Sequence, residues 1–163
     1  MIVVADTSVI LNLAFVGQEQ LLTQLFGEVL IPPAVHAEFL RLSSAPGRFA
    51  GLILPAFLQT RPVSLIPASL RGDQRLDAGE AEALALALEL HADIVLMDET
   101  AGRQVALQQG LVPVGGLGLL VEGKKKGLVP AVAPILRTLV EQARFRASQS
   151  LLRETLRLAS EAP

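Results

Sequence analysis

The stretch Ile2-Val3-Val4-Ala5-Asp6-Thr7-Ser8, near the start of the chain, decides the fold class. Its first four residues form a short uninterrupted apolar run, which is typical of a strand buried on both faces of a parallel sheet. Asp6-Thr7-Ser8 then supplies three residues that favour helix N-caps, and a helical pattern begins at Val9. The stretch therefore predicts a buried strand that ends at Asp6 and turns directly into a helix.

The alternation of a short apolar strand with a helix repeats along the chain. Further strands are expected at 29–31, at 94–97 and at 112–114, with a weaker candidate at 63–66. The expected helices cover 9–16, 21–26, 33–42, 80–90, 100–108, 116–126, 130–142 and 148–160. This order predicts an α/β sandwich of three layers, with a short, mostly parallel central sheet and a helical C-terminal extension.

The stretch from Ser43 to Gly72 is the least regular part of the sequence. It holds four Pro, three Gly and four Ser in thirty residues. We expect this stretch to form a mobile loop outside the three layers, with a short helix at 50–58.

The composition excludes several classes of protein. The chain has 163 residues, of which 51% are hydrophobic and 18% charged, and its mean hydropathy of +0.48 is too high for a disordered or fibrous chain. No apolar run reaches the roughly 18 residues that a membrane-spanning helix needs. The chain has no Cys, which excludes disulfides, thiolate metal sites and cysteine nucleophiles and favours a location in the reducing cytoplasm.

The charges are unevenly distributed, although the net charge is only −2. Residues 1–100 hold five Arg against twelve Asp and Glu, whereas residues 101–163 hold nine Lys and Arg against four Glu. One interpretation is a solvated surface whose signs happen to segregate. The other is an acidic metal site beside a basic rim that receives an anionic substrate.

Four acidic residues are expected near the carboxyl end of the sheet, where ligands bind in doubly wound folds. Asp6 and Asp98 each end a strand. The helix at 80–90 descends by about 16 Å and the strand at 93–97 climbs back by about 16 Å, so Asp98 returns to the level of Glu80. Glu38 lies on the flank of its helix, at the border of the core.

Carboxylates that meet in one cleft repel one another unless some of them are protonated or a cation joins them. A ligand set made only of oxygen favours Mg²⁺ or Mn²⁺ over Zn²⁺. Such an ion suits phosphodiester hydrolysis, because it polarises phosphoryl oxygens and activates water. Taken singly, however, Asp6 and Asp98 could be N-caps, Glu80 a first-turn acid that complements the helix dipole, and Glu38 a surface residue.

Several sequence elements, in this order and spacing, together resemble one family. They are Val3-Val4-Ala5-Asp6-Thr7-Ser8, Ile31-Pro32-Pro33-Ala34-Val35-His36-Ala37-Glu38, Gly79-Glu80-Ala81-Glu82-Ala83, Leu96-Met97-Asp98-Glu99 with Gly102-Arg103, and the glycine-rich 114–120. The chain resembles the PIN domain family, in the prokaryotic, toxin-type branch with a Gly-Glu-Ala-Glu-Ala element. The likeness covers about 1–160 and implies one PIN-like domain over 1–163, with its core at about 1–127 and its C-terminal helices at about 130–160.

The resemblance implies a metal-dependent ribonuclease that cuts single-stranded RNA, as the toxin of a toxin–antitoxin pair. It assigns catalysis to Asp6, Glu38, Glu80 and Asp98, and binding of Mg²⁺ or Mn²⁺ to Asp6, Glu80 and Asp98. Thr7, Ser8 and Glu99 would support them. Many members carry Asp where this chain has Glu80, and either Asp98 or Glu99 could be the ligand. RNA and an antitoxin protein are the expected partners, and the apolar composition suggests a homodimer.

The expected RNA contacts are Arg103 and the run Lys124-Lys125-Lys126. The lysines also suit the last turn of a helix in any protein, and Arg103 could instead pair with a nearby acid. Asp77 and Glu82 are expected to be mostly solvated, and Gly115, Gly116 and Gly118 lack the spacing of a dinucleotide-binding loop. Two alternatives remain: a catalytically silent PIN-like module that binds RNA or protein, and, less favoured, an aspartyl phosphatase.

Overall fold

The computed structural model describes residues 1–163 and is built around one sheet of five parallel strands. The strands lie in the order β3-β2-β1-β4-β5. They are β1 (Val3–Ala5), β2 (Val29–Ile31), β3 (Leu58–Thr60), β4 (Ile94–Leu96) and β5 (Pro113–Val114). The expected strands at 29–31, 94–97 and 112–114 are therefore present to within one residue.

The sheet reverses its winding between β1 and β4. From β1 the chain moves outward to β2 and β3, then returns to the other side of β1 and continues through β4 to β5. Val4 of β1 pairs with Leu30 on one side and with Val95 on the other. The backbone N–H of Asp6 donates to the carbonyl oxygen of Leu96 at 2.9 Å, so the ends of β1 and β4 are held together. This edge is where doubly wound folds place their ligands.

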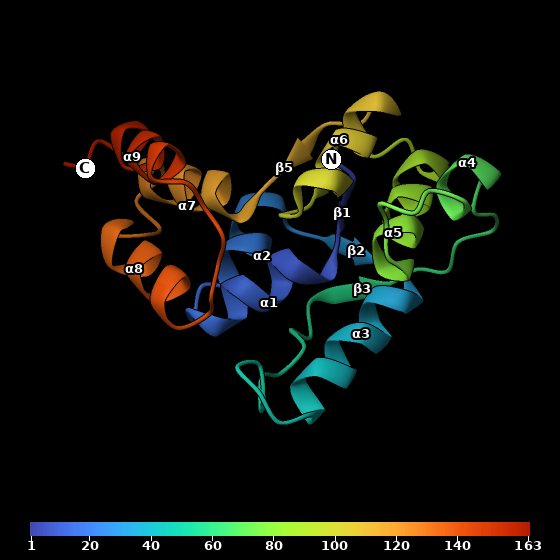
Figure 1. The fold of residues 1–163 in the computed structure, drawn as a ribbon, viewed down its shortest axis with the longest axis horizontal. Coiled ribbons are helices and arrows are strands. Elements are labelled where there is room, and N and C mark those ends of the chain that lie inside the picture. Colours follow the sequence, from blue (N-terminus) through green and yellow to red (C-terminus); the bar gives the residue numbers. More distant parts are fainter.

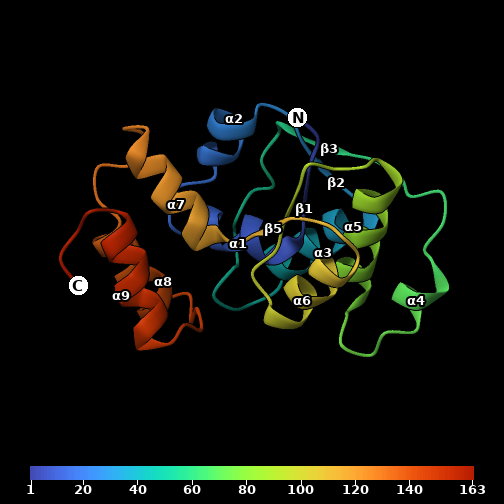
Figure 2. The ribbon, with the colours of Figure 1, turned by 90° about the horizontal axis from the view of Figure 1, so that it is seen from above.

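Helices cover both faces of the sheet, which confirms the three-layer prediction. The helices are α1 (Thr7–Phe15), α2 (Gln20–Phe26), α3 (Pro33–Ser44), α4 (Ala68–Arg71), α5 (Ala78–Glu89), α6 (Thr100–Gln108), α7 (Gly116–Lys125), α8 (Ala133–Glu141) and α9 (Gln149–Leu158). In Figure 2, β1 lies between α1 and α7 on one side and α5 on the other. Helix α3 packs against both α1 and α5.

The core is formed by the strands and by the helices that pack on them. Every residue of β1 and β2 is buried, as the uninterrupted apolar runs predict. Helix α5 is buried over most of its surface, including the run from Ala83 to Ala87, because it packs on both β1 and β4. No helix of the structure combines the length and apolar character that crossing a membrane requires.

The structure corrects two expectations for the irregular stretch. Residues 50–58 do not form a helix: turns occupy 48–51, and the third strand is β3 at Leu58–Thr60, not 63–66. Pro62 and Pro67 flank 63–66 and cannot donate to a sheet ladder. The N–H of Ser64 instead donates to the Glu89 carboxylate at 3.2 Å. The short helix α4 has no counterpart among the expected elements.

The C-terminal helices α8 and α9 lie at one end of the molecule, beyond α7 (Figure 1). The carboxylate of Glu161, just after α9, connects these helices to α7 by hydrogen bonds. It accepts hydrogen bonds from the backbone N–H groups of Val132 (2.6 Å) and Ala133 (2.9 Å), at the start of α8. It also accepts one from the Lys124 ammonium of α7 at 2.9 Å. The end of the chain therefore fixes the beginning of α8.

Candidate active site

Asp6 lies between β1 and α1, where the sequence predicts it. Its side chain is only 3% exposed, and its Oδ1 atom has no hydrogen-bond partner. Burial raises the pKa of Asp6 well above its usual value, and the negative charges of Glu80, Asp77 and Glu38 raise it further. An ionised Asp6 therefore needs a compensating positive charge.

Asp98 follows β4 and faces the same edge of the sheet. Its Oδ1 accepts a hydrogen bond from the N–H of Gly116 at 2.7 Å, and its Oδ2 accepts one from the Asn12 side-chain amide at 3.0 Å. Burial raises the pKa of Asp98, although these bonds and the charge of Arg103 partly oppose the shift. Asn12 was not predicted from the sequence, since a single polar residue on a helix carries no distinctive signal.

Glu38 reaches the site from α3. Its Oε2 accepts a hydrogen bond from the Thr7 hydroxyl at 3.0 Å, which gives Thr7 the supporting position that was expected. Glu38 is partly buried, in agreement with its predicted place at the border of the core. Burial raises the pKa of Glu38, and the negative charge of Asp77 adds to the shift.

Glu80 and Asp77 form a capping box at the start of α5. The Asp77 carboxylate accepts from the N–H of Glu80 at 2.7 Å, and Glu80 Oε1 accepts from the N–H of Asp77 at 3.1 Å. Glu80 is 5% exposed, and its Oε2 has no partner. Burial raises the pKa of Glu80 to about 7, with further contributions from the charges of Asp77 and Glu99. Asp77 is exposed, as the sequence predicts, and its carboxylate also caps α5.

Glycines make room for three of the four acids. A Cβ atom at Gly79 would lie 2.7 Å from Glu38 Oε2, and one at Gly102 would lie 2.7 Å from Glu80 Oε2. A Cβ atom at Gly116 would lie 3.4 Å from Asp98 Oδ1. Gly116, which the sequence places in a glycine-rich segment, therefore lets the backbone approach the Asp98 carboxylate closely.

Three of the four predicted acids, Asp6, Glu38 and Asp98, share one cleft of about 720 Å³. Its polar and charged lining consists of Asp6, Thr7, Ser8, Asn12, Arg48, Asp77, Asp98, Glu99, Thr100, Arg144, Arg146 and Glu38. The structure thus brings together all the predicted acids except Glu80, which does not line the cleft but whose charge raises the pKa of Asp6. Thr7, Ser8 and Glu99, the expected supporting residues, also line the cleft.

The predicted RNA-binding residues lie outside this cleft. Lys124 pairs with Glu161 at 2.9 Å, and Lys125 pairs with Glu122 at 3.6 Å. The positive charge of Arg103 lowers the pKa of Asp98, but the two residues form no ion pair. The cationic groups of the cleft are instead Arg48, Arg144 and Arg146, which sequence reasoning missed.

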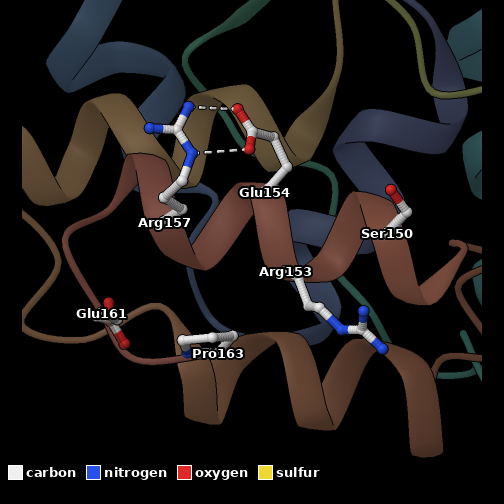
Figure 3. Close-up of a pocket in the computed structure, with 6 residues that line it drawn as sticks. All are labelled: Ser150, Arg153, Glu154, Arg157, Glu161 and Pro163. Atoms are coloured by element: carbon white, nitrogen blue, oxygen red, sulfur yellow. Dashed lines mark hydrogen bonds and ion pairs between the residues drawn. The ribbon is translucent and has the colours of Figure 1, made fainter.

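A second hollow, on the surface of α9, contains none of the predicted acids (Figure 3). Figure 3 shows the Arg157 guanidinium turned toward the Glu154 carboxylate, and their closest N–O distance is 2.6 Å. Glu161 is engaged by Lys124 and by the start of α8. We therefore place the candidate active site in the acidic cleft.

The family comparison agrees with the parallel sheet and with the acids at its edge. A family model described as a PIN domain matches residues 2–161. The chain belongs to the PIN domain family. The predicted membership of the PIN domain family is thereby confirmed, and PIN domains are generally nucleases. No curated protein matches the chain.

The chemistry of this PIN domain fits a hard divalent cation. Asp6 Oδ1 and Glu80 Oε2 are buried carboxylate oxygens without partners, and the available donors are oxygens, as Mg²⁺ and Mn²⁺ prefer. The carboxylates are distributed around the cleft and not gathered into a ready-made group of three ligands. Each of Glu38, Glu80 and Asp98 is instead held by its own local hydrogen bonds.

Proposed function

We propose that this PIN domain is a metal-dependent ribonuclease that hydrolyses phosphodiester bonds of single-stranded RNA. The observation that carries the proposal is the meeting of Asp6 and Asp98, from the two strands at the reversal of the sheet, in one cleft with Glu38. All three carboxylates have pKa values raised by burial. We further propose that it acts as the toxin of a toxin–antitoxin pair, for which its Gly79–Ala83 element is the support.

Asp6, Glu80 and Asp98 would hold Mg²⁺ or Mn²⁺, with Glu38 acting on the ion directly or through water. A divalent ion in such a site stabilises the negative charge that develops on the phosphate and lowers the pKa of water. The chain's own groups orient the acids: Asn12 and the N–H of Gly116 fix the Asp98 carboxylate. The Thr7 hydroxyl fixes Glu38, whose raised pKa suits it to accept a proton from the attacking water.

Replacement of a single acid tests the proposal. Asp6→Asn and Asp98→Asn are nearly isosteric, so each variant should fold while cleavage of single-stranded RNA in Mg²⁺ or Mn²⁺ falls roughly 100-fold or more. Glu28→Gln, which removes an exposed carboxylate outside the cleft, is the matched control and should cleave normally. Undiminished, metal-dependent cleavage by the purified Asp98→Asn variant would refute the proposed function.

The spacing of the carboxylates favours one alternative, a catalytically silent module that binds RNA or protein. No three acids are already grouped as ligands, and local hydrogen bonds would keep them apart in a module that takes up no ion. Titration calorimetry with Mn²⁺ separates the two. If the chain is a nuclease, it should bind Mn²⁺, and Asp6→Asn should abolish this binding. If it is a silent module, the titration should show no heat of Mn²⁺ binding.

A further inference from the structure

Three arginines line the acidic cleft without a carboxylate partner. Arg48 comes from the turn after α3, and Arg144 and Arg146 come from the segment between α8 and α9. The four ion pairs of the structure include none of them, although five carboxylates line the same cleft. Arginines that served only to neutralise these acids would be expected to pair with them. Their side chains are available for an anion that enters from outside.

Contacts with α1 place Glu38 near the start of this helix and Arg48 near its end. At the start of α1, Thr7 donates to Glu38. At the end of α1, the Phe15 ring packs edge-on against Phe49, with 6.2 Å between the ring centroids. The Arg48 guanidinium lies over the Phe49 ring, 4.7 Å from its centroid, so it is held at this end. Thr7 and Phe15 are the first and last residues of this nine-residue helix, so their backbones lie about 12 Å apart along its axis.

The two C-terminal arginines are presented by a defined backbone. The N–H of Phe145 donates to the carbonyl oxygen of Leu139 at 2.9 Å, and Ala143 is 1% exposed. Arg144 has a φ angle of 57°, in the left-handed region that arginine rarely adopts. Arg144 and Arg146 are themselves exposed, on either side of the partly buried Phe145. This short turn therefore carries two free guanidinium groups at the wall of the cleft.

We propose that Arg48, Arg144 and Arg146 bind the sugar–phosphate backbone of single-stranded RNA beside the phosphate that is cleaved, so that the substrate must extend from the acids along α1. This inference rests on the proposed function and names the residues that hold the substrate. The acids alone repel RNA, so attraction must come from nearby cations. Guanidinium groups suit phosphate oxygens because they donate paired hydrogen bonds. Because the arginines and the acids line the same cleft, one polymer chain could contact both at once. A free phosphate ion would need only one of the two groups.

Binding of RNA without metal tests the inference separately from catalysis. The probe is a fluorescent single-stranded RNA of twelve nucleotides in EDTA, with anisotropy as the readout. The R144Q/R146Q double variant should bind roughly tenfold or more weakly, and R48Q should also bind more weakly. The slope of log K against log salt should fall by about 0.7 for each phosphate that the variant no longer neutralises. R144K/R146K, which keeps the charges, should recover part of the affinity.

The matched control removes two exposed arginines outside the cleft, one from α8 and one from α9, the helices that flank the turn with Arg144 and Arg146. R137Q/R153Q loses the same charge and should bind the RNA as the unaltered chain does. Equal weakening in R137Q/R153Q and R144Q/R146Q would overturn the inference in favour of bulk electrostatics. Arginine-dependent binding of polyglutamate, with no RNA binding, would overturn it in favour of an acidic protein partner.

Cleavage assays distinguish a failure of this inference from a failure of the proposed function. In Mg²⁺ or Mn²⁺, R144Q/R146Q should raise KM for the twelve-nucleotide RNA with little change in kcat, since these groups would hold the substrate backbone and would not act on the phosphate that is cleaved. An unchanged KM in a chain that cleaves RNA would refute the role of the arginines alone. If the unaltered chain binds RNA through these arginines but never cleaves it, the arginine contacts stand and the nuclease proposal fails.

Discussion

Gly79 leaves room for the Glu38 carboxylate because it has no Cβ atom. An Ala in a helix normally stabilises a protein by about 0.5–1 kcal/mol relative to Gly. At this position the added Cβ would lie 2.7 Å from Glu38 Oε2 and 3.6 Å from Asp6 Oδ1. Gly79→Ala should therefore displace Glu38, lose the usual gain in stability and lower RNA cleavage roughly 10-fold or more.

Gly118→Ala is the matched control for Gly79→Ala. Its Cβ would meet only Val114 Cγ1, at an ordinary 3.6 Å. Gly118→Ala should raise the urea midpoint and leave cleavage unchanged. Equal gains in stability for the two variants, with full cleavage in both, would show that Gly79 is not needed for the placement of Glu38.

Glu80 should make the metal-free protein less stable as the pH rises. Its pKa is about 7 in the folded chain against 4.5 for an ordinary glutamate, so the unfolded chain loses this proton at lower pH than the folded chain does. The free energy of unfolding therefore falls as the pH rises from about 4.5 to about 7. Asp6, Glu38 and Asp98 act in the same direction, since their pKa values are raised too.

Urea unfolding in EDTA at pH 5 and pH 7.5 measures this loss. Glu80→Gln cannot ionise but can still accept the hydrogen bond from the N–H of Asp77. The variant should lose less stability between the two pH values than the unaltered chain, and added Mg²⁺ should reduce the loss in the unaltered chain alone. The same pH dependence in both proteins would refute this explanation.

At the scale of the element, the start of α5 combines a helix cap with a wall of the site. Asp77→Ala removes the side chain that accepts from the N–H of Glu80, and it should cost about 1 kcal/mol of stability. Glu80 would then lose part of its fixed orientation, so cleavage should fall as well. Ser148→Ala removes the corresponding cap of α9, where Ser148 accepts from Leu151. It should cost similar stability while cleavage persists; equal loss of activity in both would point to general destabilisation.

The elements that could be predicted from sequence are those whose local pattern and burial agree. The apolar run ending at Asp6 and the one before Asp98 are buried strands, so both acids fell at the correct edge. Strand β3 was missed because only Leu58 of its three residues is buried. Arg144 and Arg146 were missed because their place in the cleft depends on how the C-terminal helices pack, a tertiary arrangement that no local pattern contains.

At the scale of the whole molecule, the fold brings acidic residues from the first part of the chain together with basic residues from the last part. Asp6 and Glu38, from the acidic part of the chain, share a cleft with Arg144 and Arg146 from the basic part. The three lysines at 124–126, in contrast, lie outside it. The cleft therefore joins the first and last parts of the chain, and its basic side depends on how firmly the C-terminal helices are attached.

Glu161 is the residue on which that attachment should depend most. Burial alone would raise its pKa, but the hydrogen bonds from Val132, Ala133 and Lys124 outweigh burial and lower it. The ionised carboxylate therefore stabilises the fold above its ordinary pKa of 4.5, and this contribution is lost as the pH falls through the lowered value. Glu161→Ala leaves the start of α8 uncapped, which should cost about 1–2 kcal/mol.

The same substitution should loosen the turn that carries Arg144 and Arg146 without touching the acids. We expect faster amide hydrogen exchange at 132–146, weaker RNA binding and unchanged Mn²⁺ binding. Glu154→Gln is the control, since it breaks the exposed pair with Arg157 on the same helices and should alter none of the three. Faster exchange at 132–146 with undiminished RNA affinity would show that RNA binding does not need α8 and α9 held in place. Loss of Mn²⁺ binding would show that the acids depend directly on these helices.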